Sequence, residues 1–171
     1  MERFVKLRLV IVPRHVERVE DVVSIIERMD LKPVKLTQLN KECLNQDQVL
    51  VVDKIGVLKN LYTQAKLVFI GKTLTVGGGQ NMIEPLAFGK PTFVGPRTEN
   101  FKDVMRIFLE EKVIFQVETS DELIEGMKKV LESTRIADEI GLKAKTVIDN
   151  NRGAKNKTLK VIRELIEVKH V

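Results

Sequence analysis

The sequence predicts an α/β fold, a Rossmann-like parallel sheet flanked by helices, with a helical C-terminal segment. Apolar runs typical of buried strands alternate with segments of helical periodicity as far as residue 117, which is the pattern of a parallel sheet covered by helices. From Ser120 onward only helical patterns follow. At 171 residues, 43% of them hydrophobic, the chain is long enough for one well-buried core and short for two. We therefore expect a single domain over residues 1–171.

Short apolar runs predict six strands, and the second of them is edge-like. In chain order they cover residues 7–12, 33–37, 49–52, 67–70, 91–94 and 113–117. Between the second and third, residues 40–48 are polar and predict a loop.

Apolar residues at helical spacing predict the helices. In chain order these cover residues 16–29, 55–65, 81–88, 101–110, the segment that begins at Ser120, 135–148 and 154–168. Residues 150–153 mark the break between the last two.

The charge balance is mildly basic, with 29 Lys and Arg against 24 Asp and Glu. A dispersed charge of +5 suits an anionic ligand or an anionic membrane surface, and a well-solvated surface explains it equally well. With one Tyr and no Trp for stacking on bases, we expect no nucleic-acid partner.

Cysteine usage and hydropathy favour a cytoplasmic protein. The single cysteine, Cys43, excludes an internal disulfide and a pair of thiolate ligands, so we expect a reducing compartment and neither a metal site nor a cofactor. No apolar run approaches the roughly 20 residues of a membrane-spanning helix, and the N-terminus lacks a signal-peptide core.

A glycine-rich loop, Gly77, Gly78 and Gly79, joins the expected strand 67–70 to the expected helix 81–88. Glycines adopt positive φ and let the backbone approach a ligand closely, and main-chain amides at such a junction suit an anion. The alternative is a flexible loop. The strand and helix that follow favour the anion-binding interpretation.

Other loops follow the same edge of the predicted sheet, where open parallel sheets bind ligands. We expect residues 13–16, 53–56, 71–81 and 95–100 to form one rim. Arg14 offers a guanidinium for phosphate or carboxylate, and His15 beside it is a ligand contact, a cap or a surface residue. Asp53 caps the following helix or contacts the ligand. Arg97, in the tight turn after residue 94, contacts the ligand or is simply solvated.

Glu84 stands three residues after Asn81. Its carboxylate can accept hydrogen bonds from vicinal ribose hydroxyls, or it satisfies the Asn81 amide in a capping box, and Asn81 itself can be the cap. No nucleophile with its base is visible, so we assign no catalytic residue to this chain. Any base must come from elsewhere.

The motifs around these residues closely resemble the C-terminal, donor-binding half of bacterial 3-deoxy-D-manno-octulosonic acid (Kdo) transferase, over nearly the whole chain and in the family's order. The matching segments are Val12-Pro-Arg-His-Val-Glu-Arg18, Asp53-Lys-Ile-Gly-Val-Leu58 with Tyr62 and Ala65, Gly78-Gly-Gln-Asn-Met-Ile-Glu-Pro-Leu-Ala-Phe-Gly-Lys-Pro91, Gly95-Pro-Arg-Thr-Glu-Asn-Phe101 and Asn151-Arg-Gly-Ala154.

The resemblance implies a GT-B glycosyltransferase whose C-terminal domain binds CMP-Kdo. It also implies an inverting transfer of Kdo to lipid A precursor for lipopolysaccharide biosynthesis, with the acceptor site and the base in an N-terminal domain at the cytoplasmic face of the inner membrane. On this basis Gly78, Gly79 and Asn81 hold the phosphate, Glu84 holds the ribose, and Arg14 neutralises the phosphate or the Kdo carboxylate. His15 and Arg97 complete the expected donor site.

The sequence departs from the family pattern in two ways. Gln80 and Arg97 replace two histidines, which puts any imidazole role at those positions in doubt. The chain also begins at the family's Val-Pro-Arg-His strand. We therefore expect it to lack the N-terminal domain and its own first βα unit, and to be inactive alone.

A missing strand would leave an exposed sheet edge, which predicts a homodimer. Two alternative functions remain. One is a UDP-sugar transferase or epimerase of the same fold, and the other is a non-catalytic nucleotide-binding partner subunit.

Overall fold

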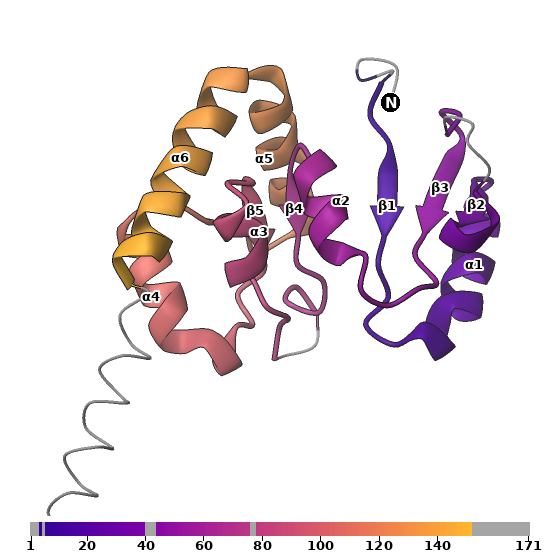
Figure 1. The fold of residues 1–171 in the computed structure, drawn as a ribbon, viewed down its shortest axis with the longest axis horizontal. Coiled ribbons are helices and arrows are strands. Elements are labelled where there is room, and N and C mark those ends of the chain that lie inside the picture. Colours follow the sequence, from indigo (N-terminus) through magenta and orange to yellow (C-terminus); the bar gives the residue numbers. More distant parts are fainter. Residues whose placement is uncertain (1–3, 5, 40–43, 76–77, 152–171) are drawn as a thin grey trace, which may run out of the picture. The chain divides into compact units, whose positions relative to one another are not determined.

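The computed structural model describes residue 4 and residues 6–39, 44–75 and 78–151 (Figure 1). The chain divides into two compact units, Met1–Leu61 and Tyr62–Val171. Each unit has its own three-stranded parallel sheet. The expectation of one domain over residues 1–171 stays a prediction.

The first unit is a three-stranded parallel sheet with a helix packed on it. The strands are β1 (Leu9–Ile11), β2 (Lys32–Lys35) and β3 (Gln48–Val51), in the order β1-β3-β2, so β3 is central. A 3-10 turn, η2 (Val16–Arg18), leads into α1 (Val19–Glu27), and a second turn, η3 (Leu36–Gln38), follows β2. Val19 and Ile26 of α1 pack against Val49 and Val51 of β3 to form the core of this unit.

The second unit contains the other three-stranded parallel sheet, in the order β4-β5-β6. Its strands are β4 (Val68–Phe69), β5 (Thr92–Val94) and β6 (Phe115–Gln116). Its helices are α3 (Ile83–Ala87), α4 (Lys102–Glu110), which follows the 3-10 turn η4 (Glu99–Phe101), α5 (Ser120–Glu132) and α6 (Thr134–Asn151). The remaining helix, α2 (Leu58–Gln64), spans the boundary between the units.

The central strand β5 organises the core of the second unit, because all three of its residues are buried. Val94 belongs to a cluster with Met82 and Leu86, and Phe93 belongs to a second cluster under α5. The Phe93 ring stacks on Phe115 of β6 with a centroid distance of 4.5 Å. β5 is therefore buried in the core of the second unit, directly before the loop 95–100.

The predicted fold class is confirmed, since parallel strands alternate with helices in the expected order (Figure 1). Differences lie at the ends of elements. The helix expected from residue 81 begins at Ile83, Gln48 belongs to β3 rather than to a loop, and α6 continues to Asn151. The helix predicted over residues 154–168 lies outside the described residues.

A helix that spans a membrane needs about 20 predominantly apolar residues. Within the residues that the structure describes, no helix is long and apolar enough to cross a membrane.

Candidate functional site

Thr73 joins the glycine-rich loop after β4 to the turn after β5. Its side chain is fully buried. The Thr73 hydroxyl donates to the Ile70 carbonyl at 2.6 Å and accepts the Gly95 N–H at 2.7 Å. The Thr73 carbonyl accepts the Arg97 N–H at 3.0 Å. The two loops therefore face each other at the carboxyl ends of neighbouring strands, as predicted.

Gly78 and Gly79 have the positive φ values, 103° and 56°, that a glycine-rich binding loop requires. Gly77 lies outside the described residues. The Gly78 N–H donates to a carboxylate oxygen of Glu99 at 3.1 Å, and the Asn100 side-chain amide donates to the Gly78 carbonyl at 2.9 Å. One amide of the predicted anion-binding loop is thus already bonded to a carboxylate of the same chain.

The surroundings of Glu99 favour its charged form. The pKa of Glu99 lies below its ordinary value because its own backbone N–H and that of Gly78 bond to the carboxylate, and because Arg97 and Lys102 lie nearby. The Arg97 side chain itself is exposed. Glu99 was not among the residues singled out from the sequence, because nothing local indicates a contact across 21 residues.

Asn81 and Glu84 form a bonded pair just before and within α3. The Asn81 side-chain amide donates to Oε1 of Glu84 at 3.1 Å, and the Asn81 side-chain oxygen accepts the Ile83 N–H at 3.0 Å. The contact uses the side chain of Asn81, whereas a capping box would use its main-chain N–H. Among the described residues, no protein donor bonds to Oε2 of Glu84, so this oxygen can accept a hydrogen bond from a ligand.

Tyr62 provides the apolar neighbour of Glu84. Burial, together with the nearby charge of Glu84, raises the pKa of the Tyr62 phenol to about 12. The Tyr62 ring also contacts Phe88, with a centroid distance of 5.7 Å. Glu84 is itself half-buried. Its carboxylate therefore lies near the Tyr62 phenol and is bonded on one oxygen by Asn81.

Arg14 and His15 follow β1 in the first unit, and both side chains are exposed. His15 occupies the N-cap position of η2 but makes no side-chain capping bond, so the capping interpretation of His15 is wrong. Its carbonyl accepts the Arg18 N–H at 3.1 Å. Surface and ligand-contact roles remain for both side chains.

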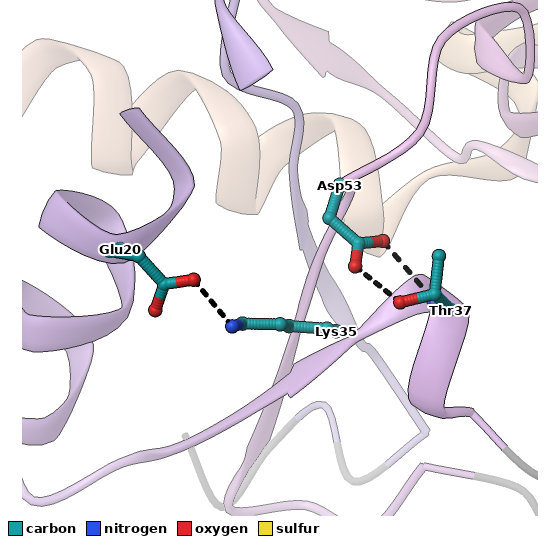
Figure 2. Close-up of polar contacts among 4 residues, drawn as sticks. All are labelled: Glu20, Lys35, Thr37 and Asp53. Atoms are coloured by element: carbon teal, nitrogen blue, oxygen red, sulfur yellow. Dashed lines mark hydrogen bonds and ion pairs between the residues drawn. The ribbon is translucent and has the colours of Figure 1, made fainter. Parts of the chain in front are cut away.

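Asp53, after β3, binds Thr37, after the neighbouring strand β2 (Figure 2). One carboxylate oxygen accepts the Thr37 N–H at 3.0 Å and the other accepts the Thr37 hydroxyl. Asp53 therefore does not cap the following helix, which begins only at Leu58. Figure 2 also shows the ion pair between Lys35 and Glu20, with an N–O distance of 2.6 Å.

The structure thus brings together the predicted site residues of the second unit. These are Gly78, Gly79, Asn81, Glu84 and Arg97, all in the loops after β4 and β5 or at the start of α3. Arg14 and His15 belong to the first unit, so the single rim of four loops stays a prediction. Among the described residues no group of three or more His, Cys, Asp or Glu side chains can hold a metal ion.

Comparison with known proteins gives a consistent family assignment. The family described as glycosyl transferases group 1 matches residues 29–147. A bifunctional glycosyltransferase/methyltransferase of Fusobacterium nucleatum is 35% identical over 132 residues, which are 77% of this chain and 20% of that protein.

Two further relatives are 3-deoxy-D-manno-octulosonic acid transferases. That of Haemophilus influenzae is 29% identical over 169 residues, covering 98% of this chain and 39% of its own length. That of Aquifex aeolicus is 30% identical over 125 residues, which are 73% of this chain and 34% of that protein. The chain therefore spans between 20% and 39% of the length of these curated relatives.

One solved structure is closely similar. The C-terminal CMP-Kdo binding domain of WaaA from Acinetobacter baumannii superposes with a TM-score of 0.77 at 25% sequence identity. The match covers 86% of this chain and 76% of that one.

Proposed function

This chain belongs to the group 1 glycosyltransferase family, and we propose that it is the CMP-Kdo-binding half of a Kdo transferase. The observation that carries the proposal is the fold likeness to the CMP-Kdo binding domain of the Acinetobacter protein, over most of both chains. The alignment with the Haemophilus Kdo transferase, which runs along nearly the whole chain, supports it.

The geometry of the second unit supports specific roles for its residues. Gly78 and Gly79, with positive φ and no Cβ, allow the donor phosphate to approach main-chain amides, and Asn81 lies beside them. Glu84 holds the ribose hydroxyls through Oε2, since Oε1 is bound by Asn81. Arg97 contributes positive charge from the facing loop, whose backbone is bonded to Thr73.

Arg14 and His15 complete the proposed donor site from the first unit. The exposed guanidinium of Arg14 suits the phosphate or the Kdo carboxylate, because it can bond an oxyanion in a bidentate manner. His15 lies beside it as a further donor or acceptor.

The proposed reaction is an inverting transfer of Kdo from CMP to a sugar hydroxyl. Bond cleavage leaves negative charge on the CMP phosphate, and fixed main-chain amides with Arg14 and Arg97 stabilise that charge. This chain offers binding and leaving-group stabilisation. The base that takes the proton of the acceptor hydroxyl is proposed to lie in an N-terminal domain, so the isolated chain is expected to lack turnover.

The acceptor is proposed to be lipid A precursor, which the N-terminal domain would bind at the cytoplasmic face of the inner membrane. A transferase assay tests this part, run with this chain alone and with a candidate N-terminal chain added. Activity only in the mixture supports a split enzyme, whereas CMP binding without activity in either case supports a non-catalytic nucleotide-binding subunit.

Calorimetric titration with CMP tests the donor site directly. We expect CMP to bind more tightly than UDP. We expect Glu84→Ala to lower the affinity for CMP at least tenfold, because hydrogen bonds to a charged group are worth about 1.5–3 kcal/mol. Glu125→Ala on α5 is a matched control, since Glu125 is exposed and pairs only with Lys128 in the described structure. Failure of CMP, CDP and UDP alike to bind contradicts the proposal, and a preference for UDP favours a UDP-sugar transferase or epimerase.

A further inference from the structure

A carboxylate occupies the loop that is expected to receive the donor phosphate. The Gly78 N–H donates to Glu99 at 3.1 Å, and the cations nearest to Glu99 are Arg97 and Lys102. These are the kinds of contact that a phosphate would make. A ligand phosphate approaching Gly78 therefore meets a negative charge already in place.

The chain on both sides of Glu99 is held by other contacts. Glu99 begins η4, between Arg97, whose N–H is bonded to the buried Thr73, and Asn100, whose side chain holds the Gly78 carbonyl. A Cβ on Gly78 would lie 3.1 Å from the Asn100 amide nitrogen, so the two loops are packed closely here. The backbone that carries Glu99 therefore lies beside the glycine loop, with its carboxylate on the Gly78 N–H.

We propose that Glu99 is a specificity-determining residue that makes this site favour donors with one phosphate over donors with two. This inference rests on the proposed function, because it needs a nucleotide phosphate at Gly78. The first phosphate is attracted by Arg97 and by the Gly79 main-chain amide, whereas a second one adds negative charge beside the Glu99 carboxylate, which already takes the Gly78 N–H. The repulsion energy of two like unit charges about 5 Å apart in a water-like dielectric corresponds to about a fourfold change in affinity.

The test compares CMP with CDP, which share the base and ribose and differ by one phosphate. Calorimetry measures both affinities for the unmodified chain, for Glu99→Gln and for the control Glu110→Gln. Glutamine keeps an oxygen that can accept the Gly78 N–H, so only the charge is removed. Glu110 ends α4 and pairs with Arg106 on the surface, so the control makes the same change of net charge elsewhere.

We expect the unmodified chain to prefer CMP, and Glu99→Gln to shift the CMP-to-CDP affinity ratio about fourfold toward CDP, with no shift for Glu110→Gln. The shift should shrink at high salt, because these charges are solvent-exposed. Urea denaturation of each variant checks that folding is retained.

The remaining outcomes separate the two proposals. The role of Glu99 is overturned if CMP binds but Glu99→Gln leaves the CMP-to-CDP affinity ratio unchanged. It is also overturned if the unmodified chain prefers CDP. Either result leaves the proposed donor site intact. No binding of either nucleotide contradicts the donor site, and the role of Glu99 falls with it.

Discussion

The Asp53 carboxylate is stabilised in its charged form by Thr37. Hydrogen bonding to Thr37, chiefly from its hydroxyl, lowers the pKa of Asp53 below its ordinary value (Figure 2). A carboxyl group with a lowered pKa in the folded state stabilises the fold above the unfolded-state pKa of about 3.9, and this contribution is lost as the pH falls through the folded-state pKa.

We therefore expect Asp53→Asn to lower the free energy of unfolding at pH 7, and the difference from the unmodified chain to shrink as the pH falls below about 4. Urea denaturation between pH 7 and pH 3 measures it. Thr37→Val should reproduce part of the loss, because it removes the hydroxyl that bonds to Asp53. Asp138→Asn, on the exposed surface of α6, is the matched control. A difference that is constant over the whole pH range would contradict this explanation.

Sequence reasoning found the site residues whose signal is local and missed those that depend on distant contacts. Gly78, Gly79 and Glu84 were identified from their spacing within one loop and one helical turn. Glu99 and Thr37 were missed, since each bonds to a group 21 or 16 residues away. Such contacts depend on which strands lie side by side, and a local pattern does not encode this.

The same distinction holds for helices and strands. Their order was predicted because hydrophobic periodicity is a property of each segment alone. Several of their ends were not predicted, because side-chain contacts set them. The Asn81 side-chain oxygen takes the Ile83 N–H, and α3 begins there. The start of α5 at Ser120 was predicted and is confirmed, and there the Thr119 hydroxyl accepts the Glu122 N–H at 3.2 Å.

Helix α6 approaches the end of α3 at Gly141. A Cβ on Gly141 would lie 2.3 Å from the Gly89 carbonyl oxygen, so the backbone of one of these segments would have to shift. Helix propensity alone favours Ala over Gly by about 1 kcal/mol. We expect Gly141→Ala nevertheless to lower the free energy of unfolding by about 1–3 kcal/mol, because overpacking outweighs propensity. Urea denaturation measures this.

Gly71→Ala is the control for this prediction, since a Cβ on Gly71 would meet nothing within 4 Å. We expect it to change the free energy of unfolding by less than about 0.5 kcal/mol. A stabilising Gly141→Ala would show that α6 can move away from α3 at little cost.

At the scale of the whole molecule, the fold class could be predicted from the sequence, but which loops come together could be predicted only in part. Alternation of strand and helix patterns indicates parallel sheets wherever they occur. The meeting of loops 71–81 and 95–100 follows from the adjacency of β4 and β5. A single rim that also includes Arg14 and Asp53 would require contacts between the two units. The sequence pattern within either unit does not specify such contacts.

The two edges of the first sheet differ in how they oppose association. Edge strand β2 carries Lys32, Pro33 and Lys35, which discourage pairing with another strand. Edge strand β1 has no such protection, since Leu9 is 49% and Val10 is 37% exposed. Within the sheet of the first unit, the outer edge of β1 has no partner strand among the described residues, and such an edge is a template for another strand. We therefore expect the homodimer predicted from the sequence to form through β1 rather than through β2.

Val10→Lys places a charge on this edge without touching the proposed donor site. We expect the unmodified chain to associate as its concentration rises, and Val10→Lys to remain monomeric, because pairing would bury an ammonium group and place like charges close together. Light scattering over a concentration series measures both. Leu142→Lys, at a side chain 71% exposed on α6, adds the same charge elsewhere and should still associate. An unmodified chain that is monomeric throughout would contradict the dimer, and association that survives Val10→Lys would place the interface away from β1.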